Sequence, residues 1–156
     1  MNNTPIDEQH LEFLFGKNDV GLLDKISEDF HSRIRDKLVA QGYLGLKLTF
    51  SPVISNITFT GTRLVDIAAM NGMTKQAIRQ IANEIESLGY IKRIPDPRDG
   101  RAKNLVFSER GVEMVQAAIN VVKDIQTENA ALLGQEKMQQ LHELLSELAD
   151  KLTAQH

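Results

Sequence analysis

The sequence contains no cysteine among its 156 residues. That absence excludes a disulfide framework, a cysteine-ligated zinc site, a thiol nucleophile and a cysteine-based redox switch. The sequence also has no apolar run near the roughly 20 residues that a membrane span requires, and its start lacks the basic and apolar segments of a secretory signal. We therefore expect a cytoplasmic protein without a membrane partner.

Motifs that carry catalysis are also missing. The sequence has no nucleophile-elbow G-x-S-x-G, no phosphate-binding G-x-x-x-x-G-K-[ST] and no zinc-binding H-E-x-x-H. Its four histidines are scattered, and no two of them share an i, i+4 spacing: His10, His31, His142 and His156. The sequence predicts neither an enzyme nor a bound cofactor or metal. Metal sensing by histidines and carboxylates from distant segments is the minor alternative.

Charge is divided unevenly along the chain, although the whole carries only −3. The segment 63–110 holds nine basic and six acidic side chains, a net +3, whereas the rest holds nine basic and fifteen acidic ones, a net −6. A mildly basic module thus lies between acidic flanks. Contacts with phosphate groups are expected at that module, and non-specific affinity for nucleic acid should be modest.

The N-terminal part of the chain shows helical periodicity. A short apolar pattern in 2–18 predicts an arm or short helix that docks on an apolar surface, and 19–41 predicts a longer helix that stops at Gly42. Thr49 or Ser51 is expected to cap a second, shorter helix that ends near Ile57. A chain of 156 residues is long enough to bury a sizeable core, and 42% of its residues are hydrophobic, as is typical of globular proteins.

The stretch 64–81 predicts a helix-turn-helix. Ala68 is small where the two helices would touch, and Gly72 occupies the turn position that requires a positive φ. Ile67, Met73, Ile78 and Ile81 supply apolar contacts between the helices. We interpret the methionines near the turn, Met70 and Met73, as core residues rather than as sensors of oxidation.

The second helix of this motif, 74–88, has two distinct faces. Its apolar stripe faces a core, and Thr74 is expected to cap it. Its polar stripe holds hydrogen-bond donors and no carboxylate before Glu84: Lys75, Gln76, Arg79, Gln80 and Asn83. Such side chains suit base edges in the major groove of DNA. An ordinary solvated helix face is the alternative.

A hairpin follows that helix. Residues 90–94 and 103–107 read as two strands, and Asp99-Gly100 is a strong turn dipeptide between them. The loop presents Arg98 and Arg101, side chains that can enter a narrow minor groove. In the alternative interpretation the hairpin is solvated and its arginines pair with Asp96 and Asp99. The two interpretations are compatible, because an internal pair would orient the other arginine.

Taken together, these segments resemble the MarR family of winged-helix transcription regulators. The resemblance is carried by Leu88-Gly89-Tyr90-Ile91, by the wing 96–103 and by Ser108-Glu109-Arg110-Gly111, and it covers about 22–152. Gly100 departs from the bulkier, often basic residue of many members. The resemblance implies a dimer with recognition helices in adjacent major grooves and wing arginines in flanking minor grooves. It also implies a small anionic or aromatic effector between the DNA-binding and dimerisation parts.

The C-terminal part supports a dimer independently of the family. Ser108 is expected to cap a long helix whose apolar positions are Val112, Val115, Ala118, Val122 and Ile125. After a break at Gly134, a heptad-like seam follows: Met138, Leu141, Leu145, Leu148 and Leu152. The seam could also pack on its own chain, but two-fold dimers are the commonest oligomers and we favour one here.

These observations lead to one function. The predicted fold is mainly α with a small β-hairpin wing, divided into an N-terminal arm and long helix (1–42), a winged helix-turn-helix (43–108) and C-terminal dimerisation helices (109–156). We expect a homodimeric repressor on a pseudo-palindromic double-stranded DNA site, with Lys103 supporting the wing contacts. His31, Arg35, Tyr43 and Phe50 are candidate residues for an aromatic acid effector. The alternative is a winged helix that binds another protein instead of specific DNA.

Overall fold

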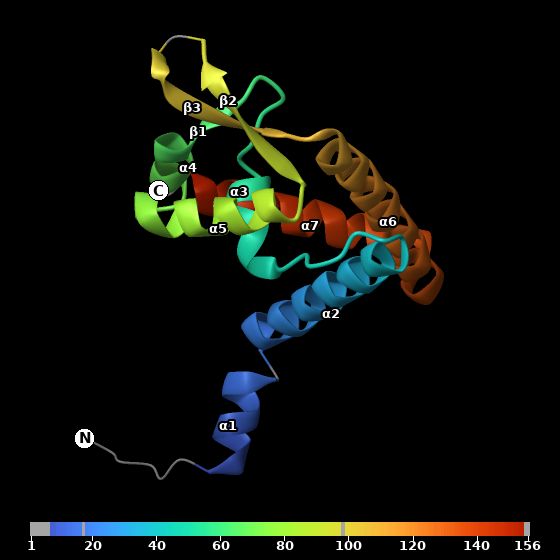
Figure 1. Ribbon diagram of the computed structural model, residues 1–156. Helices are drawn as coiled ribbons and strands as arrows, with labels where there is room; N and C mark the ends of the chain where they lie inside the picture. The colour runs from blue at the N-terminus through green and yellow to red at the C-terminus, as the bar shows by residue number, and fades with distance from the viewer. Residues whose placement is uncertain (1–6, 17, 98, 155–156) are drawn as a thin grey trace, which may run out of the picture.

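The computed structural model describes residues 7–16, 18–97 and 99–154 (Figure 1). The side chains of Phe15 and Arg101 lie outside that description. Within these described ranges, seven α-helices, one short 3₁₀ helix and three strands follow each other: α1 (Glu8–Phe15), α2 (Asp19–Ala40), η1 (Leu48–Phe50), α3 (Ser51–Ile54), β1 (Thr62–Arg63), α4 (Leu64–Met70), α5 (Lys75–Ser87), β2 (Ile91–Asp96), β3 (Asp99–Phe107), α6 (Glu109–Leu133) and α7 (Gln135–Thr153). The expected mainly α fold with a small wing is confirmed.

The wing is a three-stranded antiparallel sheet with the order β1-β3-β2, rather than the two-stranded hairpin expected from the sequence. Thr62 pairs with Leu105, and Arg63 pairs with Asn104. Two residues are too few to show the alternation that identifies a strand in a sequence. β2 and β3 also extend further toward the turn than expected, to Asp96 and from Asp99.

The helix-turn-helix forms as predicted. Ile67 and Ile78 are fully buried, and Ala68 is nearly so. Gly72 has a φ of +60°, a left-handed conformation that costs a side-chain-bearing residue about 1–2 kcal/mol. The hydroxyl of Thr74 accepts the backbone N–H of Ala77 at 3.2 Å, which caps α5. These helices pack with the inner face of the sheet on one core.

Met70 does not belong to that core, contrary to the sequence-based interpretation. It is 65% exposed at the end of α4, whereas Met73 is partly buried against the core. The core-facing side of α4 carries Ile67 and Ala68, and Met70, the last residue of the helix, lies off that side.

A second core lies between α2 and α6. It contains Leu38, Val121 and Ile125, and the two cores meet at Tyr43 and Leu46, which pack against both. Ser108 caps α6 by accepting the backbone N–H of Gly111 at 3.0 Å, as expected. The long helix α2 has the predicted extent.

The buried stripe of α6 differs from the expected one. Ile125 is buried as expected, and Val115 and Ala118 are partly buried against the two cores. Val112 and Val122, however, are exposed to 43% and 38%, and the other buried positions were not expected: Gly111, Met114, Ala117, Val121 and Ala130. α6 carries two neighbouring apolar stripes, both with helical spacing. Packing of α2 and the sheet against one of them decides which stripe is buried.

The short helix after the α2 connection is also shorter than expected. Residues 48–54 divide into η1 and α3, which ends at Ile54 rather than near Ile57. Neither Thr49 nor Ser51 is the N-cap, and the N-cap residues Lys47 and Phe50 make no side-chain cap bond. Burial of Phe50 and Val53 holds this segment against the core.

The two ends of the chain leave apolar surface uncovered. α1 projects away from the body (Figure 1), with Leu11 and Leu14 exposed to 48% and 59%. None of the residues of α7 is buried, although its seam positions are apolar. No helix in the described part of the chain is long and apolar enough to cross a membrane.

Candidate nucleic-acid interface

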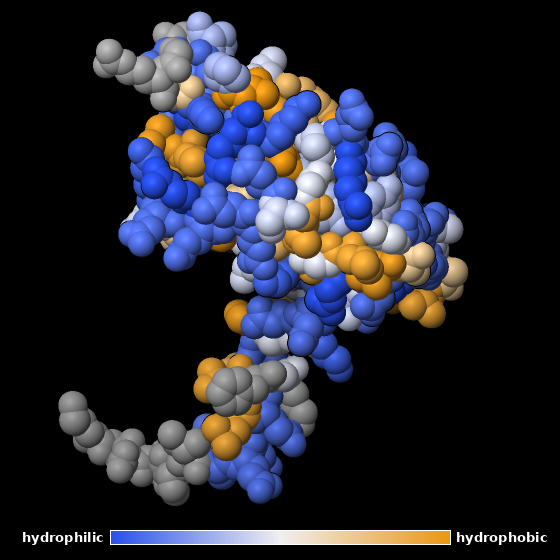
Figure 2. All heavy atoms as spheres, in the orientation of Figure 1, coloured by the Kyte–Doolittle hydropathy of each residue, from blue (hydrophilic) through white to orange (hydrophobic). Residues whose placement is uncertain are grey.

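The outer face of α5 presents the polar side chains that the sequence singles out. Ile78, Ala82 and Ile85 are completely buried on the inner face, and this fixes the opposite face toward solvent. The residues on that face are all exposed: Thr74, Lys75, Gln76, Arg79, Gln80 and Asn83. Figure 2 shows hydrophilic side chains over α5. The helix thus offers polar side chains from its N-terminal end into its third turn.

Two tertiary contacts bound this face at its C-terminal end. Arg93 of β2 donates from Nη2 to Oδ1 of Asn83 at 2.7 Å, and its other nitrogen pairs with Glu86. Lys47, which precedes η1, pairs with Glu84. The carboxylates nearest the polar face are therefore neutralised by cations. Sequence reasoning missed Arg93 and Lys47 because both are brought to α5 by folding.

The wing carries further cationic groups. Lys103 is exposed on β3, opposite Pro95 of β2. Arg98 lies outside the described residues. Arg101 belongs to β3 by its backbone, with its side chain outside the description. The structure thus places Lys103 on the same sheet that packs against α5, and leaves the two loop arginines as predictions.

A buried ion pair anchors the end of the wing. The carboxylate of Asp96 is only 4% exposed and accepts a bond from Nε of Arg63 on β1. The same carboxylate accepts the backbone N–H of Asp99 at 3.3 Å. The hydrogen bond with Asp96 raises the pKa of Arg63 above its ordinary value. The sequence-based pairing scheme for Asp96 had not included this partner, because β1 was not expected.

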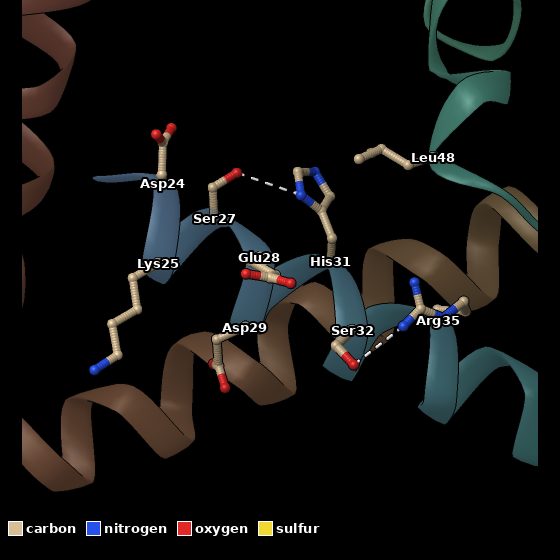
Figure 3. A pocket seen from close by; sticks show the side chains of 9 residues that line it. All are labelled: Asp24, Lys25, Ser27, Glu28, Asp29, His31, Ser32, Arg35 and Leu48. Carbon is tan, nitrogen blue, oxygen red and sulfur yellow. Dashed lines mark hydrogen bonds between the residues drawn. The ribbon is translucent and has the colours of Figure 1, made fainter. Parts of the chain in front are cut away.

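Two of the four candidate effector residues lie together. His31 and Arg35 line an open surface pocket along α2 with a volume of about 680 Å³, shown in Figure 3. His31 shares a 3.3 Å hydrogen bond with Ser27, and Arg35 donates to Ser32 at 3.1 Å. The pocket also contains three carboxylates: Asp24, Glu28 and Asp29. Its mixed charge makes it a poor site for an anion.

His31 and Arg35 also border a smaller cavity, of about 260 Å³, between α2, η1, α3 and α6. Its apolar lining includes Leu38 and Met114, and Lys47 adds a third basic group. The linings of these two cavities include neither Tyr43, which packs between the two cores, nor Phe50, which is 1% exposed. The lining of the smaller cavity combines apolar side chains with the basic side chains of His31, Arg35 and Lys47.

The described residues contain no group of three or more histidine, aspartate or glutamate side chains arranged to hold a metal ion. The chemistry available at the candidate interface is hydrogen bonding and charge attraction, from α5 and from the wing. Its donor groups match phosphate oxygens and the acceptors on base edges.

Comparison with known proteins shows which family model and which solved structures this chain resembles. Residues 44–102 match the model of the MarR family. No curated protein matches the chain by sequence. Among solved structures, transcriptional regulator Tm0710 from Thermotoga maritima is similar, with 24% identity, a TM-score of 0.60 and coverage of 86% of this chain and 93% of its own.

Structures of two other proteins, MarR and S. aureus MepR, share the fold. MarR aligns with a TM-score of 0.68 at 20% identity, over 86% of this chain and 96% of its own. A mutant of S. aureus MepR bound to an oligodeoxyribonucleotide aligns with a TM-score of 0.57 at 18% identity, over 86% of this chain and 98% of its own. S. aureus MepR bound to ethidium bromide aligns with a TM-score of 0.58 at 19% identity, over 86% of this chain and 96% of its own. These likenesses establish a common fold.

Proposed function

We propose that the protein is a homodimeric transcriptional repressor of the MarR type, because residues 44–102 match the model of that family. It binds a pseudo-palindromic site in double-stranded DNA and is released by a small aromatic or anionic effector. The observation that carries the proposal is the outer face of α5, where Lys75, Gln76 and Arg79 project beside a winged sheet without a carboxylate among them. A MepR mutant of the same fold has been solved with DNA.

In the proposed complex the two parts of the winged helix make different contacts. The outer face of α5, from Thr74 to Asn83, enters the major groove, where arginine, glutamine and asparagine side chains can contact base edges. Arg98, Arg101 and Lys103 of the wing contact phosphates or the adjacent minor groove. Two symmetric recognition helices require half-sites about one turn, roughly 10 bp, apart.

The proposed dimer uses the apolar surfaces at both ends of the chain. Leu145, Leu148 and Leu152 of the α7 seam are exposed to between 41% and 52%. Asn18 accepts the N–H of Gly21 at 3.0 Å and donates to the carbonyl of Leu14 at 3.1 Å, so one side chain caps α2 and the end of α1. α1 projects away from the body of its own chain (Figure 1), which supports a contact with the second copy.

The effector site that we propose is the 260 Å³ cavity bordered by His31 and Arg35. It lies between α2 of the dimerisation region and η1 and α3 of the winged module. A ligand there can change DNA affinity only if it binds one arrangement of these parts more tightly than the other. Its combination of apolar and basic lining side chains favours an aromatic acid.

The test is selection of sequences from a random duplex library at two salt concentrations, together with the mass of the selected complex. A pseudo-palindrome bound by one dimer is the expected result. Arg79→Ala should lose sequence discrimination, whereas Arg101→Ala should weaken all sequences similarly and flatten the salt dependence. The recovered site then serves to screen phenolic acids for release of DNA.

Absence of enrichment at low salt would overturn the proposal. Wild-type affinity in either arginine variant would contradict the role of that residue. If no sequence is enriched and heparin retention shows no salt dependence, the winged helix is better explained as a protein-interaction module.

A further inference from the structure

Arg93, on strand β2 of the wing, donates a hydrogen bond to the side chain of Asn83 on α5. Its Nη2 lies 2.7 Å from Oδ1 of Asn83, and its Nη1 pairs with Glu86. Asn83 and Glu86 are three residues apart on α5, so they lie next to each other on the helix surface. The planar fork of one guanidinium therefore spans both side chains.

The fold explains why Arg93 is available for this contact. In the sheet, Arg93 pairs with Leu105, which is 1% exposed, so both side chains project from the face that covers the core. α5 packs against β2 on that side. The Arg93 side chain is only 22% exposed. The ion pair with Glu86 neutralises its half-buried charge and keeps the guanidinium in place.

The chemistry of the contact determines how the Asn83 amide is oriented. A guanidinium group has five N–H donors and no acceptor. The group of Asn83 that faces Arg93 must therefore be its oxygen, and its NH₂ group points away. An asparagine that reads adenine in the usual bidentate way accepts from N6 with this oxygen and donates to N7 with its nitrogen.

We propose that Arg93 sets Asn83 as a donor-only contact, which binds hydrogen-bond acceptors on DNA and does not pair with adenine. The acceptors are phosphate oxygens or the N7 and O6 atoms of guanine. This inference rests on the proposed function, because it requires α5 to lie on DNA. Arg93 acts as a positioning residue, since it touches Asn83 and not the base.

The first test is Asn83→Asp, a nearly isosteric change on an exposed side chain that leaves the core intact. Aspartate keeps an oxygen for Arg93 and loses the NH₂ donors, so affinity for the selected site should fall roughly tenfold or more. Loss of preference at one position of each half-site identifies a base acceptor, and a uniform loss across sequences identifies a phosphate. Wild-type affinity would overturn the proposal.

The second test measures the amide in the free protein. In Arg93→Met the side-chain NH₂ resonances of Asn83 should move toward the values of a solvated asparagine, and selection with this variant should gain adenine at any base position that Asn83 contacts. Lys92→Met, on the adjacent exposed residue of β2, is the matched control. It should change neither the Asn83 resonances nor the selected sequence. Unchanged Asn83 resonances in Arg93→Met would refute the contact itself.

The two experiments separate failure of this inference from failure of the proposed function. If the wild-type protein enriches no sequence, both are refuted as statements about DNA, even where the resonances confirm the bond. If the wild type selects a site that pairs Asn83 with adenine, the proposed function stands and the donor-only role is refuted.

Discussion

At the residue scale, Gly111 controls how closely α6 approaches the start of the wing. A Cβ at this position would lie 1.8 Å from the carbonyl oxygen of Tyr90, which is backbone and has little room to move. That same oxygen accepts the N–H of Ser108 at 3.0 Å, so a hydrogen bond holds the N-cap of α6 against Tyr90. Glycine is required at position 111 because the backbones of α6 and Tyr90 lie too close together to leave room for a Cβ.

Gly111→Ala should therefore destabilise the protein strongly. Relief of the overlap requires α6 to shift away from the Tyr90 carbonyl, and we expect a loss of about 3 kcal/mol or more in the free energy of unfolding. Urea denaturation measures this loss. Gly72→Ala is the matched control, because its Cβ would meet no atom within 4 Å and the cost is that of its positive φ, about 1–2 kcal/mol. An equal or smaller loss for Gly111→Ala would contradict the argument.

At the element scale, the joint between α2 and α6 is held by an apolar strip and by a cluster of charges at its end. Lys37 donates to Oε1 of Glu128 at 2.8 Å, and Arg33 donates to Oε2 of Glu128 at 2.5 Å and to Asn129 at 2.9 Å. The bonds from Lys37 and then Arg33 hold the pKa of Glu128 below its ordinary value of 4.5. Two helices nearly a hundred residues apart in sequence thus share one carboxylate.

The direction of this pKa gives the sign of a pH effect. A carboxylate with a lowered pKa in the folded state contributes stability above its unfolded pKa, and that stability is lost as pH falls through the folded pKa. We expect the melting temperature of Glu128→Gln to be lower than that of the wild type at pH 7. Below about pH 4 the difference should shrink, because the wild-type group becomes protonated. Calorimetry between pH 7 and pH 3 measures both.

Glu113→Gln, on the exposed surface of the same helix, serves as the control. Its melting temperature should follow that of the wild type over the whole range. A constant difference between Glu128→Gln and the wild type down to pH 3 would show that the carboxylate contributes through something other than its ionised form.

At the scale of the whole molecule, the chain buries two cores and leaves an apolar surface at its ends. The winged-helix core and the α2–α6 core share Tyr43 and Leu46, so the two halves are joined by packing rather than by a free linker. Figure 2 shows hydrophobic side chains gathered on the projecting α1. The surfaces of α1 and α7 are those that the proposed dimer covers.

Leu145→Glu should separate the proposed dimer. A carboxylate in the centre of an apolar seam would have no partner when buried, and an unpaired buried charge costs about 3–5 kcal/mol. The dissociation constant should therefore rise about a hundredfold or more, as measured by sedimentation equilibrium. Ser146→Glu, outside the seam on the same helix, should leave the constant unchanged. A wild-type chain that sediments as a monomer would refute the dimer.

Most helices and the polar outer face of α5 follow from local sequence features. The periodicity of α2 and α5, the caps at Thr74 and Ser108, and the turn at Gly72 each involve residues only a few positions apart. Such interactions are readable from the sequence because helical geometry relates near neighbours in a fixed way. For the same reason the polar residues of α5 were correctly expected on one exposed face.

Other features depend on contacts between distant residues. Strand β1 exists because Thr62 and Arg63 meet β3 about 40 residues later, and the buried stripe of α6 depends on the packing of α2. The Arg63–Asp96 and Arg93–Asn83 contacts likewise join residues whose spacing carries no local signal.

The sequence by itself determined where α2, α5 and α6 begin, where the helix-turn-helix turns and which residues face outward on α5, because these depend on periods and caps within one element. Only the tertiary structure decided which cations meet α5, how the Asn83 amide is oriented and which apolar surfaces remain exposed. Those features depend on how separate elements pack, and packing follows the summed burial of the whole chain rather than any single segment.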